Sequence, residues 1–403
     1  MSATVLADFD PLSESGLRDP FPVWAEARRR APVFYAPAVG MWMVTRREHV
    51  LEALRDRETF SSAHNMDSPP PPERVRELLP GGYPWTAPSL ANGDGGDHRA
   101  LRRHLGRALS RGRVGGLWPF IRATADELVA GVAPRLRADV LADVAFPLAE
   151  RTIAAVVGLT GDDVEAMRRW LAALDVSNAG DGTVEELVAA GREHARFERR
   201  CHALLDGGGH DGDVVAELAA CPVPRAQATS ALLQVLMAGV ATTAHLVANT
   251  TRLVLDRPAL HERLAREPDG DLLAQTIEEC LRHTAPVRGM PRTATRDTDL
   301  GGATIRRGDR LFLLFGSANR DEDFAACPDE LRIDREGARD HVAFGRGAHF
   351  CPGAPLARLE ARAALAALLR LPGLRVEHGA LPEPHRTLEI HAFKALPVRW
   401  DPR

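Results

Sequence analysis

One stretch of the sequence combines a cysteine with several glycines immediately before a predicted helix. Residues 344–353 read Phe-Gly-Arg-Gly-Ala-His-Phe-Cys-Pro-Gly, and the helix predicted at 354–371 follows directly. The positive end of a helix dipole and its unpaired N–H groups lower the pKa of a nearby thiol and favour the thiolate that ligates a metal. Glycines allow a flat cofactor to approach the backbone. The loop therefore predicts a cofactor or metal site at Cys351, although a lone cysteine in a glycine turn is more often inert.

This loop resembles the haem-binding signature of the cytochrome P450 family, Phe-x-x-Gly-x-x-x-Cys-x-Gly. The residues at the four fixed positions are Phe344, Gly347, Cys351 and Gly353. Gly345 and His349 also match the variable positions of soluble bacterial members. The resemblance covers roughly residues 11–400. It implies a mainly α fold with a smaller β region that encloses haem b, with Cys351 as the axial ligand of the iron.

A second part of the resemblance is a Glu-x-x-Arg pair at Glu279 and Arg282. The spacing lets a carboxylate meet a guanidinium on one helix face, which alone would describe an ordinary surface pair. In the family, the pair belongs to a buried ion-pair network that an arginine before the haem loop completes. Arg335 is the best match for that arginine, and we expect all three residues to be structural rather than catalytic.

Buried haem carboxylates need neutralising donors, and arginine and histidine suit that task. His98 and Arg102 lie four residues apart, so a helix places them on one face. Together with Arg292 and His349, they occupy the positions that the resemblance assigns to the haem propionates. The resemblance assigns further cofactor contacts to five residues: Phe344, Gly345, Gly353, Ala238 and Gly239.

The stretch Ala-Gly-Val-Ala-Thr-Thr at 238–243 lies in the middle of a predicted buried helix, residues 226–251. The resemblance makes it the segment over the haem face where dioxygen is activated, with Thr242 and Thr243 as catalytic residues. Ala241 stands where the family has Asp or Glu, and a positioned acid contributes about 10²–10⁴-fold in rate. Three explanations stay open. Water ordered by the threonines supplies protons, the substrate carries its own acid or alcohol, or the enzyme uses peroxide or unusual oxidative chemistry.

The substrate pocket is less well defined. By resemblance, it is lined by the loop 83–90, by Val287 and Arg288, and by the turn near Ile390. A guanidinium binds carboxylates and phosphates well, so Arg288 suggests an anionic or strongly polar substrate. The alternative is that Arg288 packs against a haem propionate or points outward.

Composition and charge exclude some partners. The 403 residues carry 51 Lys and Arg against 55 Asp and Glu, a formal charge of −4, so no nucleic acid is expected as a partner. The uncharged stretch 226–251 holds too many hydrogen-bonding groups for a lone span in lipid, so no membrane is expected either. The N-terminus lacks a signal-peptide pattern, and the 5 cysteines show no pairing spacing, which indicates a reducing cytoplasm.

No reductase segment is visible, so we expect electrons from a separate ferredoxin that has its own ferredoxin reductase. Four arginines would lie on the cysteine side of haem and receive an acidic partner, unless they are simply solvated: Arg103, Arg107, Arg346 and Arg358. The sequence leaves open whether the small-molecule substrate arrives free or bound to a carrier protein.

Hydrophobic periodicity predicts a mostly α protein. A helix is expected at 22–30, helices dominate 97–281, and short strands are expected at 32–35, 41–45, 292–295, 303–305 and 310–315. The resemblance implies that residues 1–403 form a single cytochrome P450-like unit, with a helix-rich part and a smaller sheet-rich part.

The sequence thus predicts a haem-thiolate monooxygenase that inserts one oxygen atom of dioxygen into a small organic substrate, in a bacterial secondary-metabolite or catabolic pathway. A peroxide-driven or oxidative-coupling enzyme is the alternative that Ala241 favours. A non-catalytic haem-binding helper protein is a third reading, which the retained Cys351, Thr242 and propionate donors disfavour.

Overall fold

The computed structural model describes residues 6, 9–66, 71–179, 182–377 and 383–402. Their internal contacts divide the chain into two compact units. The first unit comprises Met1–Ser61, Leu117–Ala149 and Ala241–Arg403, and the second comprises Ser62–Gly116 and Glu150–Val240. Two helices, α9 (Phe146–Val157) and α13 (Arg225–Leu255), contribute residues to both units.

A five-stranded sheet of order β1-β2-β8-β5-β3 organises one part of the first unit. Its strands are β1 (Val33–Ala36), β2 (Met41–Val44), β3 (Phe60–Ser61), β5 (Met290–Ala294) and β8 (Arg310–Leu313). β2 and β8 are parallel, with Met43 opposite Phe312, and both side chains are fully buried in one cluster with Trp24. The short helices of this part are α2 (Glu14–Arg18), α3 (Phe21–Arg30), α4 (Arg47–Arg55) and α16 (Phe315–Ala318). The predicted helix at 22–30 and the predicted strands are therefore present, with bounds shifted by at most two residues.

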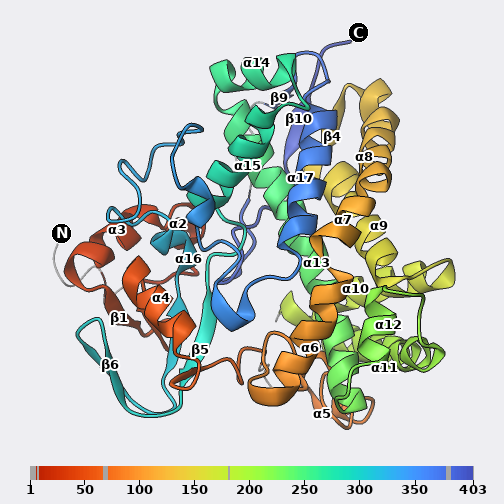
Figure 1. Ribbon diagram of the computed structural model, residues 1–403, viewed down its shortest axis with the longest axis vertical. Helices are drawn as coiled ribbons and strands as arrows, with labels where there is room; N and C mark the ends of the chain where they lie inside the picture. Colours follow the sequence, from red (N-terminus) through yellow and green to blue (C-terminus); the bar gives the residue numbers. More distant parts are fainter. Residues whose placement is uncertain (1–5, 7–8, 67–70, 180–181, 378–382, 403) are drawn as a thin grey trace. The chain divides into compact units, whose positions relative to one another are not determined.

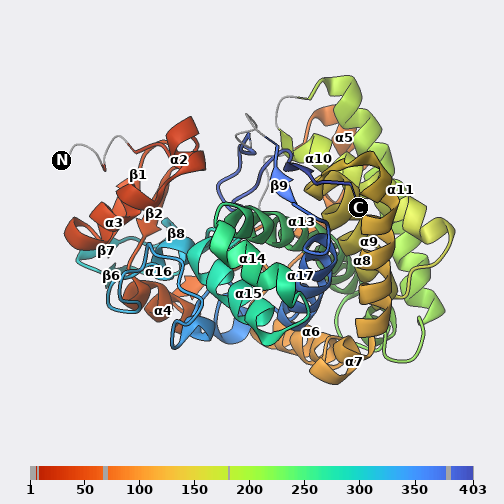
Figure 2. The same cartoon turned by 90° about the horizontal axis from the view of Figure 1, so that it is seen from above.

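The helices of the rest of the first unit pack around α17 (Ala354–Leu368), which lies beside α8 (Trp118–Val132) and α15 (Asp271–His283) in both views (Figures 1 and 2). Other regular elements are α14 (Pro258–Arg266), the hairpin β6 (Thr298–Leu300) and β7 (Ala303–Ile305), and the sheet of β4 (Arg137–Asp139), β10 (Pro397–Arg399) and β9 (Arg375–Val376). Short helical turns are η2 (Ala133–Arg135), the π-helical η3 (Val140–Ala145), η4 (Ala338–Asp340) and η5 (Gly347–His349).

Strand β4 lies inside the region that the sequence predicts as helical. Leu136, just before it, has a left-handed φ of 55°, which ends the preceding helical turn. The strand then pairs with β10 from the far end of the chain, with Ala138 opposite Val398. Local periodicity carries no information about such a distant partner, so the prediction of helix here was wrong.

The second unit is helical. Its elements are α5 (Glu73–Arg76), η1 (Pro84–Thr86), α6 (Gly95–Ala108), α7 (Arg111–Gly116), α10 (Asp162–Ala179), α11 (Val184–Gly207) and α12 (Val214–Ala219). The N-terminus of α11 has a capping box, because the Thr183 side chain accepts from the Glu186 backbone and the Glu186 carboxylate accepts from the Thr183 backbone. α10 and α11 pack along each other.

Helix α13 has 31 residues and is apolar and long enough to cross a membrane by length and composition. In the structure, 72% of its most apolar stretch is buried inside the protein, as in the core helix of a globular fold. The predicted buried helix at 226–251 is therefore present. The fold as a whole is mainly α with a smaller β region, as the sequence predicts.

Candidate active site

Cys351 sits in a loop whose backbone needs glycine at two positions. Gly345 and Gly347 have φ angles of 67° and 73°, in the left-handed region that side chains disfavour. The backbone N–H of Cys351 donates to the carbonyl of Phe344 at 2.9 Å, which closes the loop. Because α17 begins at Ala354, the half-buried Cys351 lies just before a helix N-terminus, where a thiolate is favoured.

Gly353 differs from the other two glycines of the loop. Its φ is −81°, and a Cβ added to it would lie 3.8 Å from the sulfur of Cys351, an ordinary contact. The protein alone therefore has no steric need for glycine at this position. The need would come from a flat group bound at the sulfur, which is the arrangement that the sequence predicts.

The structure brings together the three residues of the predicted ion-pair network. Glu279 and Arg282 are fully buried, and their side chains form two parallel hydrogen bonds of 2.7 and 2.8 Å. The Nε of Arg335 donates to the same Glu279 carboxylate at 3.2 Å. Arg282 also donates to the carbonyls of Asn319 and Pro328. These contacts tie α15 to the segment before the cysteine loop.

The predicted propionate donors lie in both units. In the first, Arg292 is 4% exposed on β5 and His349 ends η5. In the second, His98 is 2% exposed and lies one turn from Arg102 on α6, so the two share a helix face. Their joint contact with one cofactor stays a prediction.

Helix α13 is uninterrupted from Ala238 to Thr243. Gly239 is needed there for packing, since a Cβ would approach the Cδ1 atom of Ile153 on α9 to 2.7 Å. Ala238 is exposed and Ala241 and Thr242 are half-buried, whereas Thr243 is buried. The spacing of three and four residues places the less covered positions on one helix face, as a helix that borders a cofactor requires.

Two of the predicted substrate residues meet in the first unit. Val287 and Ile390 form an antiparallel bridge. Arg288 is 4% exposed and its terminal nitrogens donate to the carbonyls of Gly16 and Leu17 and to His391 Nδ1. Burial lowers the pKa of Arg288 to about 10. Its terminal nitrogens thus already donate hydrogen bonds to acceptors within the protein. Contact between Arg288 and an anionic substrate stays a prediction.

Sequence reasoning missed a buried polar clamp on the loop expected to line the pocket. The side-chain amide of Gln234 donates to the Trp85 carbonyl and to Asn92 Oδ1, at 2.9 and 3.0 Å. Its oxygen accepts from the Ala91 N–H at 2.9 Å, and Ser230 donates to the Ala87 carbonyl at 2.8 Å. The only signal in the sequence was the presence of polar side chains in an otherwise apolar helix.

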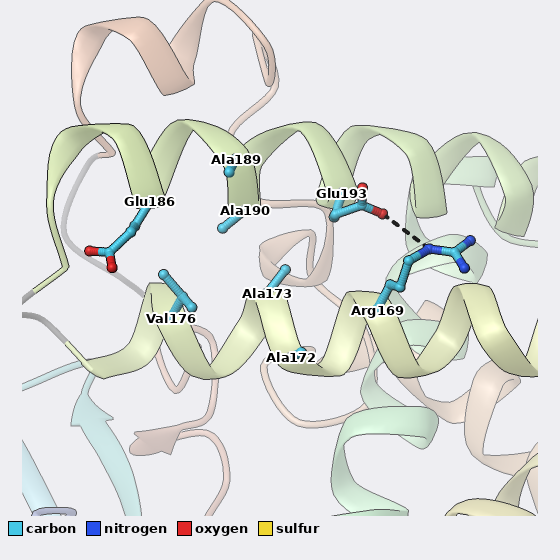
Figure 3. Close-up of a pocket in the computed structure, with 8 residues that line it drawn as sticks. All are labelled: Arg169, Ala172, Ala173, Val176, Glu186, Ala189, Ala190 and Glu193. Carbon is cyan, nitrogen blue, oxygen red and sulfur yellow. Dashed lines mark ion pairs between the residues drawn. The ribbon is translucent and has the colours of Figure 1, made fainter.

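A hollow of about 400 Å³ lies between α10 and α11 (Figure 3). Its floor consists of small apolar residues, namely Ala172, Ala173, Val176, Ala189 and Ala190. Arg169 and Glu193 form an ion pair across it with an N–O distance of 3.7 Å. None of the predicted site residues lines this hollow, and it has no group suited to redox chemistry.

Comparison with known proteins identifies the class. Residues 225–388 match the family described as "Cytochrome P450". The chain is 32% identical over 372 residues to the beta-dihydromenaquinone-9 omega-hydroxylase of Mycobacterium tuberculosis, covering 89% of this chain and 72% of the relative. It is also 32% identical over 390 residues to cytochrome P450-SU2 of Streptomyces griseolus, covering 95% and 94%. The crystal structure of the Tepidiphilus thermophilus P450 heme domain superposes with a TM-score of 0.90 at 27% identity, covering 100% of this chain and 98% of that one.

The chain belongs to the cytochrome P450 family. It has the P450 fold and is a P450 monooxygenase, whose cofactor is haem b bound through a cysteine thiolate. The residues present fit such a group in two ways. Nothing in the protein itself would clash with a side chain at Gly353, so a flat group bound at the sulfur accounts for the glycine. On α13, Ala238 and Thr242 are more exposed than their buried neighbours and form a face that a cofactor could cover.

Proposed function

We propose that Cys351 is the axial haem ligand and that the enzyme inserts one oxygen atom of dioxygen into a small organic molecule. The observation that carries this proposal is the loop itself, where two left-handed glycines and the Cys351 N–H bond to Phe344 present the sulfur before α17. Haem held by a thiolate supplies dioxygen activation and O–O cleavage when bound. The chain supplies binding, orientation and control of water.

The remaining predicted residues are proposed to serve the same site. Arg292 and His349 in the first unit, and His98 and Arg102 in the second, neutralise the propionates. Phe344, Gly345, Gly353, Ala238 and Gly239 shape the surface against the ring, and Val287 and Ile390 border the substrate. Thr242 and Thr243 order the water that delivers protons.

We also propose that residues 1–403 work as one unit. The segments of the first unit are separated in sequence by those of the second, and α9 and α13 belong to both, which supports a single functional body. Reduction by a ferredoxin and its reductase in the cytoplasm, and a place in a bacterial secondary-metabolite or catabolic pathway, fit a chain of this family. Arg107 and Arg358 are engaged by Glu217 and Glu278, so contact with an acidic ferredoxin would rely on exposed arginines such as Arg346.

The carbon-monoxide complex of the ferrous haem protein tests the ligand. The wild type should show the long-wavelength band of thiolate-ligated haem, and Cys351→Ser should lose it while a panel of other cysteine variants, such as Cys327→Ser, keeps it. A Cys351→Ser protein that retains the band would overturn the assignment. Titrating the haem absorption band with small carboxylic acids and neutral analogues then gives the substrate class, since a substrate that displaces iron-bound water shifts the band.

A second candidate function is supported by Ala241. Hydrogen peroxide carries its own two protons, so without an acid on α13 a peroxide-driven reaction, oxidative coupling included, would require less proton delivery than dioxygen activation does. The two are separated by driving the enzyme, with a compound that shifts the band, either by hydrogen peroxide or by a surrogate ferredoxin, its reductase and dioxygen. Faster product formation with peroxide alone would favour the second candidate.

A further inference from the structure

Glu278, the neighbour of Glu279 on α15, lies against two groups next to the cysteine loop, Arg358 and His341. Its side chain is 5% exposed and accepts two hydrogen bonds from Arg358 on α17, from Nε at 2.5 Å and from Nη2 at 2.9 Å. Paired bonds between a carboxylate and a guanidinium fix the guanidinium plane as well as its position. Glu278 thus sets where the Arg358 cation lies.

The second group is His341, which stands before the cysteine loop. Its Nδ1 accepts a hydrogen bond from the Ala343 N–H at 3.2 Å, so the proton of the neutral ring is on Nε2. Nε2 lies 3.3 Å from Glu278 Oε2, outside hydrogen-bond geometry. The same carboxylate therefore faces the segment 341–343 as well as α17.

Both groups converge on Phe344. The Arg358 guanidinium lies over the Phe344 ring, 4.6 Å from its centroid, and the His341 ring is 5.9 Å away. A cation over an aromatic face is attracted to the ring electrons. The carbonyl of Phe344 accepts the Cys351 N–H at 2.9 Å, so the position of this residue is transmitted to the cysteine.

We propose that Glu278 is a positioning residue for Cys351, because it fixes Arg358 and, through the Arg358 guanidinium over Phe344, the loop that presents the sulfur. This rests on the proposed role of Cys351 as haem ligand. A neutral side chain at 278 leaves the Arg358 cation over Phe344 without its anion. An uncompensated positive charge over the cysteine loop would favour an added electron on haem held there, so the midpoint potential of the haem should shift in the positive direction. Mutating a residue that orients a metal ligand typically lowers metal affinity or activity by about 10–100-fold. For Glu278→Gln we expect the low end of that range, as a faster loss of the thiolate-bound form.

The test compares Glu278→Gln with the wild-type holoenzyme in three measurements that need no substrate. These are the midpoint potential, the rate at which the thiolate band of the carbon-monoxide complex is lost, and the thermal midpoint. Asp269→Asn is the control for loss of an arginine-paired carboxylate at an exposed site, since Asp269 accepts from Arg122 at 2.6 Å and from Arg370 at 2.5 Å in the same unit, and neither arginine belongs to the cysteine loop. Glu278→Gln should shift the potential and accelerate band loss about 10-fold, whereas Asp269→Asn should lower the thermal midpoint alone.

Arg358→Met, alone and combined with Glu278→Gln, completes a double-mutant cycle. If Glu278 acts through Arg358, adding Glu278→Gln to Arg358→Met should change the potential and the rate of band loss much less than it does in the wild type. Arg358→Lys, which keeps the charge, serves if Glu278→Gln yields no holoprotein, and it should show an intermediate shift. A Glu278→Gln protein that loses thermal stability but keeps the wild-type potential and band would overturn the proposal. A wild type without the thiolate band would instead overturn the proposed function.

Discussion

Arg288 Nη2 lies 3.1 Å from Nδ1 of His391, and the same guanidinium donates to backbone carbonyls at Gly16 and Leu17. One buried cation therefore ties together the N-terminal segment, the residues that lead into β5 and the C-terminal turn. Because Nδ1 accepts from the guanidinium, the His391 ring is neutral with its proton on Nε2. Burial, followed by the charge of Arg288, lowers the pKa of His391 to about 3.

Arg288→Gln is expected to destabilise the protein by about 1–3 kcal/mol, because buried acceptors lose their donor. Chemical denaturation of the wild type and the variant measures this difference. The band titration with acids and neutral analogues should be unchanged if Arg288 is structural. Loss of the response to acids at unchanged stability would show that Arg288 anchors an anionic substrate instead.

Glu279→Ala is expected to cost about 3–5 kcal/mol, because Arg282 would be left as a buried charge without its partner. The matched control is Glu14→Ala, which removes an exposed pair with Arg18 and should cost about 0–1 kcal/mol. Equilibrium unfolding in urea gives both values. Equal losses of unfolding free energy in the two variants would contradict the inference that the buried network stabilises the fold where α15 meets the segment before the cysteine loop.

Gly347→Ala and Gly353→Ala should behave differently. Gly347 has a φ of 73°, and a Cβ there would lie 3.1 Å from the carbonyl oxygen of Leu54, so we expect a loss of about 1–2 kcal/mol in the apoprotein. Gly353 has neither constraint, so its substitution should leave apoprotein stability unchanged and affect only haem binding. Thermal melts of the apoproteins, followed by haem titration, separate the two effects. A Gly353→Ala apoprotein as unstable as Gly347→Ala would contradict this assignment.

The stability contribution of Glu278 should depend on pH. Burial alone raises the pKa of this carboxyl, but the hydrogen bonds and charge of Arg358, with a further contribution from His341, outweigh it and lower the pKa to about 2 from 4.5. A folded-state pKa below the unfolded one stabilises the protein at pH values above about 4.5, here by about 3 kcal/mol, and the contribution is lost as the pH falls towards 2. The difference in unfolding free energy between wild type and Glu278→Gln should therefore shrink below pH 4.5. A difference that is constant with pH would show that the carboxylate charge is not what matters.

Ala241→Asp is expected to increase the fraction of reducing equivalents that end in product rather than in hydrogen peroxide. Monooxygenation consumes protons because the second oxygen atom leaves as water, and the nearest titratable side chain along α13 is His245, one turn away on the same face. Burial, together with the charge of His385, lowers the pKa of His245 to about 4, so it is neutral near pH 7 and a poor proton store. An added acid should raise the ratio of product to hydrogen peroxide, with Ala226→Asp, at the exposed start of the same helix, as the control. An unchanged ratio would indicate that water held by Thr242 and Thr243 already suffices.

The sequence predicted the helical class, four of the five strands of the main sheet and the cysteine loop, because each shows in local periodicity or in a fixed spacing of residues. It did not predict the two-residue edge strand β3, or β4, whose partner β10 lies at the other end of the chain. It named Arg358 among arginines that either receive an acidic partner or are simply solvated, and it gave no sign that Glu278 pairs with this guanidinium. Spacing shows which residues share a helix face, but it does not show which helix that face meets.

The clamp on the loop from Trp85 to Asn92 has a consequence for engineering the enzyme. Gln234 and Ser230 bind mainly carbonyl and N–H groups of this loop, so its shape does not depend on the side chain of Ala87. Its neighbours do shape the loop, because Thr86 Oγ1 donates to the Tyr83 carbonyl at 2.7 Å and Pro88 fixes its own φ angle. A directed-evolution library can therefore randomise position 87 in search of new substrates while the loop keeps its path. A library that also varies Asn92, Ser230 or Gln234 would contain mostly variants in which this loop is misfolded or disordered.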